Sequence, residues 1–351
     1  MVEEIDGIGF ATADKIARKM GISESSEFRM RAGMLHCLND NSEKNGSTFM
    51  PKEVLFKNLS ELLGLEIELY REQFKNVLEN LVFDKIVVSF FKHPYNVVML
   101  TKYYIVETQI AQKLALLNTC AQQEDIELSS EIEQFEKLNK IVFDQSQKLA
   151  ITNSIQKGVN VITGGPGTGK TTIVKCIMTI LKQQKLKVML LAPTGRAAKR
   201  LSESTGEDAK TIHRGLEVDF RGDNGRFVHN DTNPLEVDAV IVDEMSMVDV
   251  MLFCALLKAL PRDCKLILVG DKDQLPSVGA GNVLDDILKS NVINVDYLTK
   301  IFRQDSGSLI ISNAHLINDG QMPILDNQSR DFFFDEKSDV NVIRETIVDM
   351  V

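Results

Sequence analysis

The sequence contains one dense group of residues whose types and spacing could bind phosphate. Residues 161–172 read Val-Ile-Thr-Gly-Gly-Pro-Gly-Thr-Gly-Lys-Thr-Thr and match the pattern Gly-x-x-x-x-Gly-Lys-[Ser/Thr]. In such a loop the glycines let backbone N–H groups converge on phosphate, while the lysine reaches the outer phosphates and the hydroxyl ligates Mg²⁺. The alternative is a glycine-rich turn without a ligand. We expect a phosphate site made of Gly164, Gly165, Pro166, Gly167, Thr168, Gly169, Lys170, Thr171 and Thr172.

Two adjacent carboxylates, Asp243 and Glu244, follow the apolar run 239–242. Neighbouring side chains diverge at a strand end, so one carboxylate can hold Mg²⁺ while the other polarises an attacking water. An Asp-Glu pair alone is more often a solvated turn, but its place after an apolar strand downstream of a phosphate loop favours function. Gln274 follows a third apolar run, 265–269, and its amide could sense the terminal phosphate or simply face solvent.

Polar and basic residues after the apolar run 187–192 could contact a nucleic-acid backbone. Thr194, the backbone at Gly195 and Arg196, which follow Pro193, could grip the sugar-phosphate chain of a single strand. A helix cap with solvated charges is the alternative. His213 and Arg214 are a weaker signal of the same kind, because a lone histidine is usually structural.

Apolar strands and helices alternate from residue 144 onward. We expect helices over 144–157, 170–184, 196–203 and 248–259, and strands over 159–163, 187–192, 238–242 and 264–269. Short strands that are apolar on both sides, alternating with helices, imply a parallel sheet covered on both faces. The ligand then belongs at the carboxyl ends of the strands, where the phosphate loop lies.

The residues before this alternation predict a mainly helical region. Gly7-Ile-Gly9 and the apolar spacing that follows resemble a helix-hairpin-helix, whose glycines present N–H groups to a DNA phosphate; a structural helix-turn is the alternative. Helical stretches over 51–63 and 68–81, then β-rich runs over 85–91 and 96–100, suggest a winged-helix-like unit. We expect an accessory region over 1–120, a Gln- and Glu-rich linker over 121–140, an α/β domain over 141–300 and the start of a further domain over 301–351.

Composition narrows the class of protein. No apolar run in the 351 residues approaches the roughly 18 residues of a membrane span. The first residues are acidic where a signal peptide is basic, so we place the chain in the cytoplasm, away from membranes. The formal charge of −10 argues against a nonspecific nucleic-acid coat protein but permits a local basic groove. The five cysteines form no CxxC pair and are expected to be free thiols in the core.

Together these segments make the sequence similar to the RecD-like branch of superfamily 1 DNA helicases. The ordered set is Gln147, 164–172, 192–201, 211–214, 243–249, 270–281 and 298–304, within a resemblance that covers residues 5–351. The resemblance implies a RecA-like P-loop NTPase domain with a parallel sheet, ATP and Mg²⁺ as cofactors, single-stranded and duplex DNA as partners, and movement 5′ to 3′. By this resemblance Gln147 would recognise adenine, Lys170 and Thr171 would hold phosphate and Mg²⁺, and Asp243 and Glu244 would be metal holder and base.

The resemblance implies further roles. Gln274 would couple the γ-phosphate to DNA, and Arg303 would stabilise charge developing on that phosphate, for which a guanidinium is suited. Thr194, Arg196, His213 and Arg214 would lie along single-stranded DNA. Members of the branch continue into a full second RecA-like domain, so we expect this chain, which stops at Val351, to be a fragment that binds nucleotide but is impaired in unwinding. The main hypothesis is an ATP-dependent DNA helicase, and the alternative is a non-motor, ATP-gated DNA-binding module.

Overall fold

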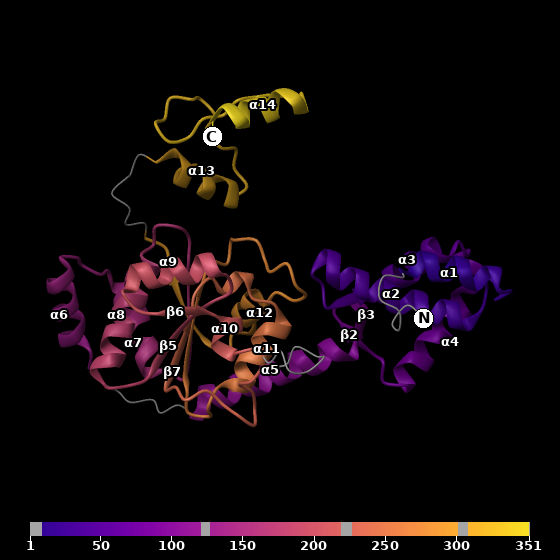
Figure 1. The fold of residues 1–351 in the computed structure, drawn as a ribbon, viewed down its shortest axis with the longest axis horizontal. Helices are drawn as coiled ribbons and strands as arrows, with labels where there is room; N and C mark the ends of the chain where they lie inside the picture. The colour runs from indigo at the N-terminus through magenta and orange to yellow at the C-terminus, as the bar shows by residue number, and fades with distance from the viewer. Residues whose placement is uncertain (1–8, 121–126, 219–226, 301–307, 351) are drawn as a thin grey trace. The chain divides into compact units, whose positions relative to one another are not determined.

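The computed structural model describes residues 9–120, 127–218, 227–300 and 308–350 (Figure 1). The chain divides into two compact units. The first unit combines Met1–Gly164 with Lys170–Leu298, and the second combines Gly165–Gly169 with Thr299–Val351. Below, the N-terminal region is 9–120, the α/β domain is 127–300 and the C-terminal segment is 308–350.

A six-stranded sheet forms the centre of the α/β domain, in the order β6-β5-β7-β8-β4-β9. Its strands are β4 (Val159–Gly164), β5 (Val188–Ala192), β6 (Ala209–Thr211), β7 (Ala239–Val242), β8 (Lys265–Gly270) and β9 (Asn294–Leu298). All neighbouring strands are parallel, which confirms the predicted α/β fold. The two edge strands, β6 and β9, were not expected from the sequence.

Helices cover both faces of this sheet (Figure 1). They are α6 (Ser129–Asn139), α7 (Gln145–Gln156), α8 (Lys170–Gln183), α9 (Gly195–Thr205), α10 (Ile212–Leu216), α11 (Val250–Ala259) and α12 (Val283–Ser290), with the 3-10 turn η1 (Met245–Met247). Successive strand residues point to opposite faces, so Val161 and Leu268 join one buried cluster while Ile162 and Ile267 join another. Burial on both faces explains the near-continuous apolar strands.

The predicted linker over 121–140 is corrected by helix α6. Leu128, Ile132 and Phe135 are buried in the same cluster as Ile173 of α8, so the described part of this stretch belongs to the α/β core. The three apolar side chains recur at helical spacing, and Glu133 and Gln134 of the same helix are exposed. Residues 121–126 lie outside the described residues.

The N-terminal region combines helices with a small antiparallel sheet of order β1-β3-β2. Its elements are α1 (Phe10–Lys19), α2 (Glu27–Asn45), β1 (Phe49–Pro51), α3 (Lys52–Leu63), α4 (Ile67–Phe83), β2 (Val87–Lys92), β3 (Tyr95–Leu100) and α5 (Thr101–Cys120). Met30, Phe56 and Phe74 are fully buried at its centre. The mainly helical character is as predicted, and the helices followed by a hairpin appear as expected, with β1 as an added strand.

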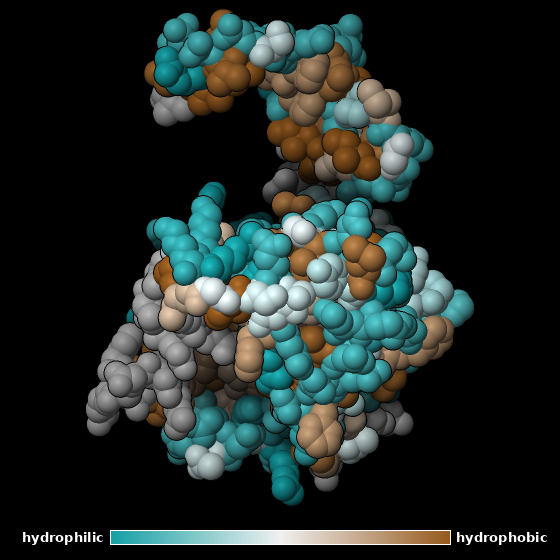
Figure 2. Space-filling model, turned by 90° about the vertical axis from the view of Figure 1, so that its right-hand side faces the viewer, coloured by the Kyte–Doolittle hydropathy of each residue, from teal (hydrophilic) through white to brown (hydrophobic). Residues whose placement is uncertain are grey.

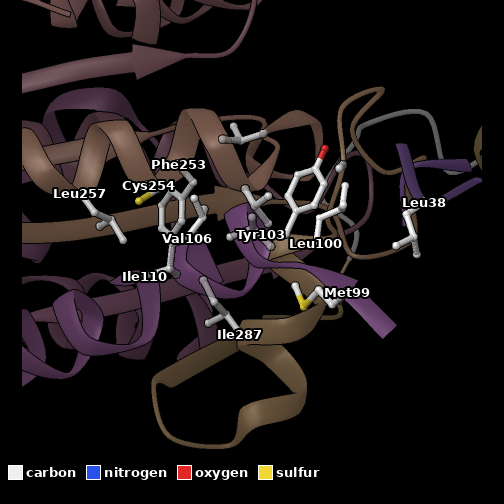
Figure 3. Packing of buried hydrophobic residues seen from close by; sticks show 14 of the residues in the cluster. Leu38, Met99, Leu100, Tyr103, Val106, Ile110, Phe253, Cys254, Leu257 and Ile287 are labelled. Carbon is white, nitrogen blue, oxygen red and sulfur yellow. The ribbon is translucent and has the colours of Figure 1, made fainter. Parts of the chain in front are cut away.

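Helix α5 joins the N-terminal region to the α/β domain. Figure 3 shows Val106 and Ile110 of α5 beside Phe253, Cys254 and Leu257 of α11, all within one buried cluster. Lys113 Nζ also donates a 2.9 Å hydrogen bond to the carbonyl of Leu260. The two parts therefore share a core.

The C-terminal segment contains α13 (Leu309–Asn318) and α14 (Val340–Met350). The side-chain amide of Asn313 is buried and bonds both the N–H and the carbonyl of Ile324, at 2.8 and 2.9 Å. No residue of α14 is buried, and exposed apolar side chains give this segment the brown patches at the top of Figure 2. Among the described residues, none of the helices has the length and apolarity needed to cross a membrane.

Candidate active site

The phosphate loop lies between the end of β4 and the start of α8. Gly167 and Gly169 have φ values of 82° and 86°, a left-handed conformation that glycine adopts without steric cost. Thr168 Oγ1 donates a 2.8 Å hydrogen bond to the carbonyl of Gly165 and closes the turn. Helix α8 starts directly after the loop, and the first N–H groups of a helix have no partner within it, so they attract anions. Local geometry and helix polarity thus both suit phosphate.

Lys170 is half-buried at the first position of α8, and its Nζ donates to the carbonyl of Gly164. Burial lowers the pKa of Lys170, while the carboxylates of Asp271, Glu244 and Asp243 raise it. These carboxylates follow β7 and β8; β8 lies beside β4 in the sheet, and β7 lies on the other side of β8. The structure therefore brings the predicted lysine and both predicted carboxylates together.

The turn after β7 separates the two adjacent carboxylates. The N–H of Asp243 donates a 2.9 Å hydrogen bond to the carbonyl of Leu191, which ties this strand end to β5. Glu244 has a φ of 54°, so the chain changes direction directly after Asp243. Burial first, and then the charge of Glu244, raise the pKa of Asp243 to about 6. A buried carboxyl group beside a second carboxylate is an environment that a divalent cation would stabilise.

Arg200 is a site residue that the sequence did not indicate. It lies on α9, which follows β5, and its Nη1 is 3.9 Å from Oε1 of Glu244. From the sequence it belonged only to a basic helix near a DNA contact. Its place at the carboxylates depends on β5 lying next to β7, and the order of strands is not encoded in any local pattern.

Asp271 is a second residue to which the sequence motifs assigned no role of its own. It is 3% exposed at the end of β8, where its carboxylate accepts a 3.1 Å hydrogen bond from the N–H of Asp273. The N–H of Lys272, which directly follows Asp271, donates a 3.2 Å hydrogen bond to Thr163 Oγ1. This bond ties the loop after β8 to β4. Gln274 is exposed on this loop. Its γ-phosphate role stays a prediction.

Comparison with known proteins agrees with this arrangement. The family described as "AAA domain" matches residues 147–280, and the family described as "ATP-dependent RecD2 DNA helicase HHH domain" matches residues 1–49. The ATP-dependent RecD2 DNA helicase of Deinococcus radiodurans is 30% identical over 323 residues, which are 91% of this chain and 44% of that protein. The chain is similar to RecD-like helicases over most of its length.

Other RecD-like relatives cover less of the chain. The RecBCD enzyme subunit RecD of Haemophilus influenzae is 39% identical over 165 residues, 40% of this chain and 26% of that subunit. Among solved structures, the Pif1 helicase of Candida albicans aligns with 24% identity and a TM-score of 0.41, over 52% of this chain and 45% of that one. The chain thus spans less than half the length of the curated relatives it matches.

Gln147 has a structural partner in this RecD-like chain. It is 4% exposed, its N–H donates to Asp144 Oδ1 at 2.8 Å, and its Oε1 accepts from the N–H of Asp144 at 3.1 Å. This reciprocal pair is a capping box that starts α7. The adenine role expected for Gln147 stays a prediction beside this capping role.

The residues expected along DNA lie at the starts of two neighbouring helices. Thr194 caps α9 by accepting a 3.2 Å hydrogen bond from the N–H of Ala197, and Arg196 is exposed in the first turn. His213 and Arg214 are exposed on α10. Ala192 pairs with Thr211 across β5 and β6, so both helices begin at the same edge of the sheet. Pro193 and Gly195 lie in the turn that starts α9.

Two predicted site residues, Gly7 and Arg303, lie outside the described residues. Gly9 is exposed immediately before α1, where its carbonyl accepts from the N–H groups of Thr12 and Ala13. All five cysteines are free thiols, and all but Cys120 are buried. Burial raises the pKa of Cys176 and of Cys264 to about 12, so these thiols stay protonated.

Proposed function

We propose that this RecD-like chain binds and hydrolyses ATP, and that the protein uses this energy to move 5′ to 3′ on single-stranded DNA and unwind duplex. The observation that carries the proposal is the convergence of Lys170 with Asp243 and Glu244 beside the start of α8. A lysine, two carboxylates and a helix N-terminus at one sheet edge are the parts that phosphoryl transfer needs. The name of the Deinococcus radiodurans relative, an ATP-dependent DNA helicase, supports the same activity.

Each side chain has a distinct role in this proposal. When ATP binds, the ammonium of Lys170 would leave the carbonyl of Gly164 and bind the outer phosphates. The new hydrogen bonds would be to a charged acceptor. Glu244 would orient the attacking water and accept its proton. Arg200 would help to orient the carboxylate of Glu244 from its position at 3.9 Å. Thr171 and Asp243 would hold Mg²⁺, which neutralises phosphate charge when bound.

Two further residues would link this site to its surroundings. Gln274 lies on the loop after β8 and would respond to the γ-phosphate, and Arg303 would add positive charge during its transfer. Gln147 would contact the adenine from the start of α7. The roles of all three follow from the family resemblance.

The DNA would run along the sheet edge where α9 and α10 begin. Arg196 and Arg214 are exposed there on helices that follow paired strands, so both guanidinium groups could reach one sugar-phosphate chain. His213 and the backbone at Gly195 offer further contacts. A DNA strand bound there would lie beside α9, the helix that carries Arg200. DNA binding would then take place close to Glu244.

Lys170→Ala tests the nucleotide site in this chain. Removing a charge-assisted partner of the phosphates should weaken Mg-ATP binding roughly tenfold to a hundredfold, measured with a fluorescent ATP analogue, while the circular dichroism spectrum stays unchanged. Lys137→Ala is the matched control, because Lys137 is an exposed lysine of α6 whose ion-pair partner among the described residues is Glu133 of the same helix. Equal nucleotide affinity in the two variants would rule out the proposed site.

The helicase proposal is tested on the native gene product. Steady-state ATP hydrolysis should rise when single-stranded DNA is added, and a duplex with a 5′ tail should be unwound in preference to one with a 3′ tail. The alternative, an ATP-gated DNA-binding module, predicts nucleotide-dependent DNA affinity without DNA-stimulated hydrolysis. Turnover that is the same with and without DNA would exclude the helicase.

A further inference from the structure

The loop that carries Gln274 ends against a turn of the N-terminal region. The N–H of Gly281 donates a 2.8 Å hydrogen bond to the carbonyl of Gly46, in the turn between α2 and β1. We use the name α2–β1 turn for residues 43–48, which are the end of α2 and the turn that leads to β1, and the name Gln274 loop for residues 271–281. The two are far apart in sequence, yet their residues line the two sides of one cleft.

The end of the Gln274 loop has no room to move on its other side. A Cβ atom added at Gly281 would lie 2.1 Å from Cγ1 of Val250, and one added at Gly279 would lie 2.6 Å from Oδ2 of Asp249. Val250 also donates its N–H to the carbonyl of Ala280 at 3.1 Å. The loop end is therefore clamped between the start of α11 and the α2–β1 turn.

The α2–β1 turn is itself held firmly. Gly46 ends α2 with a φ of 65°, and the buried hydroxyl of Ser42 donates to the carbonyl of Ser47 at 3.0 Å. Thr48 Oγ1 donates a 2.7 Å hydrogen bond to Glu107 of α5. Because α5 packs on α11 (Figure 3), the helix that braces the turn lies against the helix that confines the loop.

We propose that the α2–β1 turn is a positioning element for the Gln274 loop, through which the N-terminal region influences ATP hydrolysis. The backbone carbonyl of Gly46 fixes the far end of the loop, while the N–H of Lys272 fixes its near end to Thr163 of β4. A shift of the turn would pass to the loop and so to Gln274. The link to hydrolysis rests on the proposed function, whereas the anchoring of the loop stands without it.

Gly46→Val tests the anchoring. A β-branched residue does not tolerate a φ of 65°, so the turn must rearrange and its carbonyl leaves Gly281. Gly64→Val is the matched control, because Gly64 also ends a helix of the N-terminal region, with a φ of 67° and no atom within 4 Å of an added Cβ. Gly46→Asn should retain the wild-type state, since asparagine accepts the left-handed conformation.

Hydrogen exchange of the nucleotide-free chain is the first readout. Peptides covering residues 275–284 should exchange about fivefold to tenfold faster in Gly46→Val, the effect of one lost backbone hydrogen bond, and should match wild type in Gly64→Val and Gly46→Asn. Thr48→Val, which removes only the brace to Glu107, should show a smaller acceleration and serves if Gly46→Val does not fold. Equal exchange in all variants would overturn the proposal.

DNA-stimulated hydrolysis in the native gene product is the second readout. Gly46→Val should lower kcat about tenfold, since a small misplacement of a positioning group has effects of this order, with the Kd for Mg-ATP unchanged. An equal fall of kcat in Gly64→Val would show a general loss of stability and would contradict the positioning role. If wild type binds no ATP, the proposed function fails, and the exchange result still decides the anchoring.

Discussion

Nη1 of Arg200 lies 3.9 Å from Oε1 of Glu244, although the two residues follow different strands of the sheet. Because β5 and β7 are neighbours, the helix after one strand reaches the carboxylate after the other. Arg200 also follows Arg196 on α9, the helix whose first turn is expected to meet DNA. The partner of the candidate base, Arg200, and a candidate DNA contact, Arg196, thus lie on the same helix.

Glu244→Gln should abolish hydrolysis and leave binding intact. The amide keeps the size of the side chain but cannot accept the proton of the attacking water, so kcat should fall by about 10² to 10⁴. The Kd for Mg-ATP should change by less than about threefold, because the residue is not assigned to the phosphates or the ion. Single-turnover hydrolysis and analogue binding measure the two quantities.

Glu203→Gln is the control for this prediction. Glu203 is an exposed carboxylate of α9 that pairs only loosely with Lys199, at 3.9 Å. It should leave kcat at the wild-type value. A Glu244→Gln variant that still hydrolyses ATP at the wild-type rate would assign the base elsewhere.

Arg196→Ala and Arg214→Ala should each weaken binding of a single-stranded oligonucleotide without regard to its sequence. A contact to one phosphate releases counterions, so the slope of log K against log salt should fall by about 0.7 for each lost contact. Fluorescence anisotropy over a series of salt concentrations measures the slope. Lys137→Ala on α6 is the control, and a slope that is unchanged in both arginine variants would contradict the proposed DNA path.

Asn160→Ala should destabilise the α/β domain strongly. The buried side-chain amide of Asn160 donates to Asp296 at 3.0 Å and accepts from Asn294 at 2.7 Å, within a polar network between β4 and β9. Burial already raises the pKa of Asp296, and losing this donor leaves the carboxylate poorly compensated. We expect the free energy of unfolding in urea to fall by about 2–4 kcal/mol.

The loss in Asn160→Ala should be larger at pH 8 than at pH 5, since only the ionised form of Asp296 needs the donor. Asn153→Ala is a graded comparison, because Asn153 is half-buried and donates to the other oxygen of Asp296, at 2.8 Å. It should cost less than Asn160→Ala. The reverse order of the two losses would contradict a central place for Asn160 in this network.

Glu107→Gln should change how stability depends on pH. Burial raises the pKa of Glu107, and the hydrogen bond from Thr48, which lowers this pKa, offsets only part of the rise. The carboxyl group therefore binds its proton more tightly in the folded state than in the unfolded chain. The resulting stability is fully present below the unfolded pKa and is lost as the pH rises through the folded pKa. Glutamine has no such loss, so the variant should gain stability relative to wild type between about pH 4 and pH 8.

Urea unfolding at both pH values measures this difference. The exposed Glu79 of α4 provides the control variant Glu79→Gln, which should follow the wild-type curve. A Glu107→Gln variant whose stability relative to wild type falls as the pH rises would show that the ionised carboxylate is favourable at this interface.

Local patterns predicted much of the α/β domain. The strands that lead to the phosphate loop and to Asp243 are short, fully buried and rich in Val and Ile, and both their type and their parallel arrangement could be anticipated. The prediction of a linker over 121–140 missed α6, because this helix has few apolar residues. Only the contact of α6 with α8 shows that these apolar residues face a core. The edge strand β6 has three residues, too few for a pattern.

The sequence by itself determined the chemistry of the site. The phosphate loop, with its glycines in a left-handed conformation, and the carboxylate pair at a strand end are each encoded in a short run of consecutive residues. Tertiary structure alone decided which distant groups join them. Arg200 reaches Glu244, and Gly281 reaches Gly46, only once the order of strands and the packing of α5 on α11 are set. Such contacts depend on burial summed over the whole core, which no short stretch of sequence records.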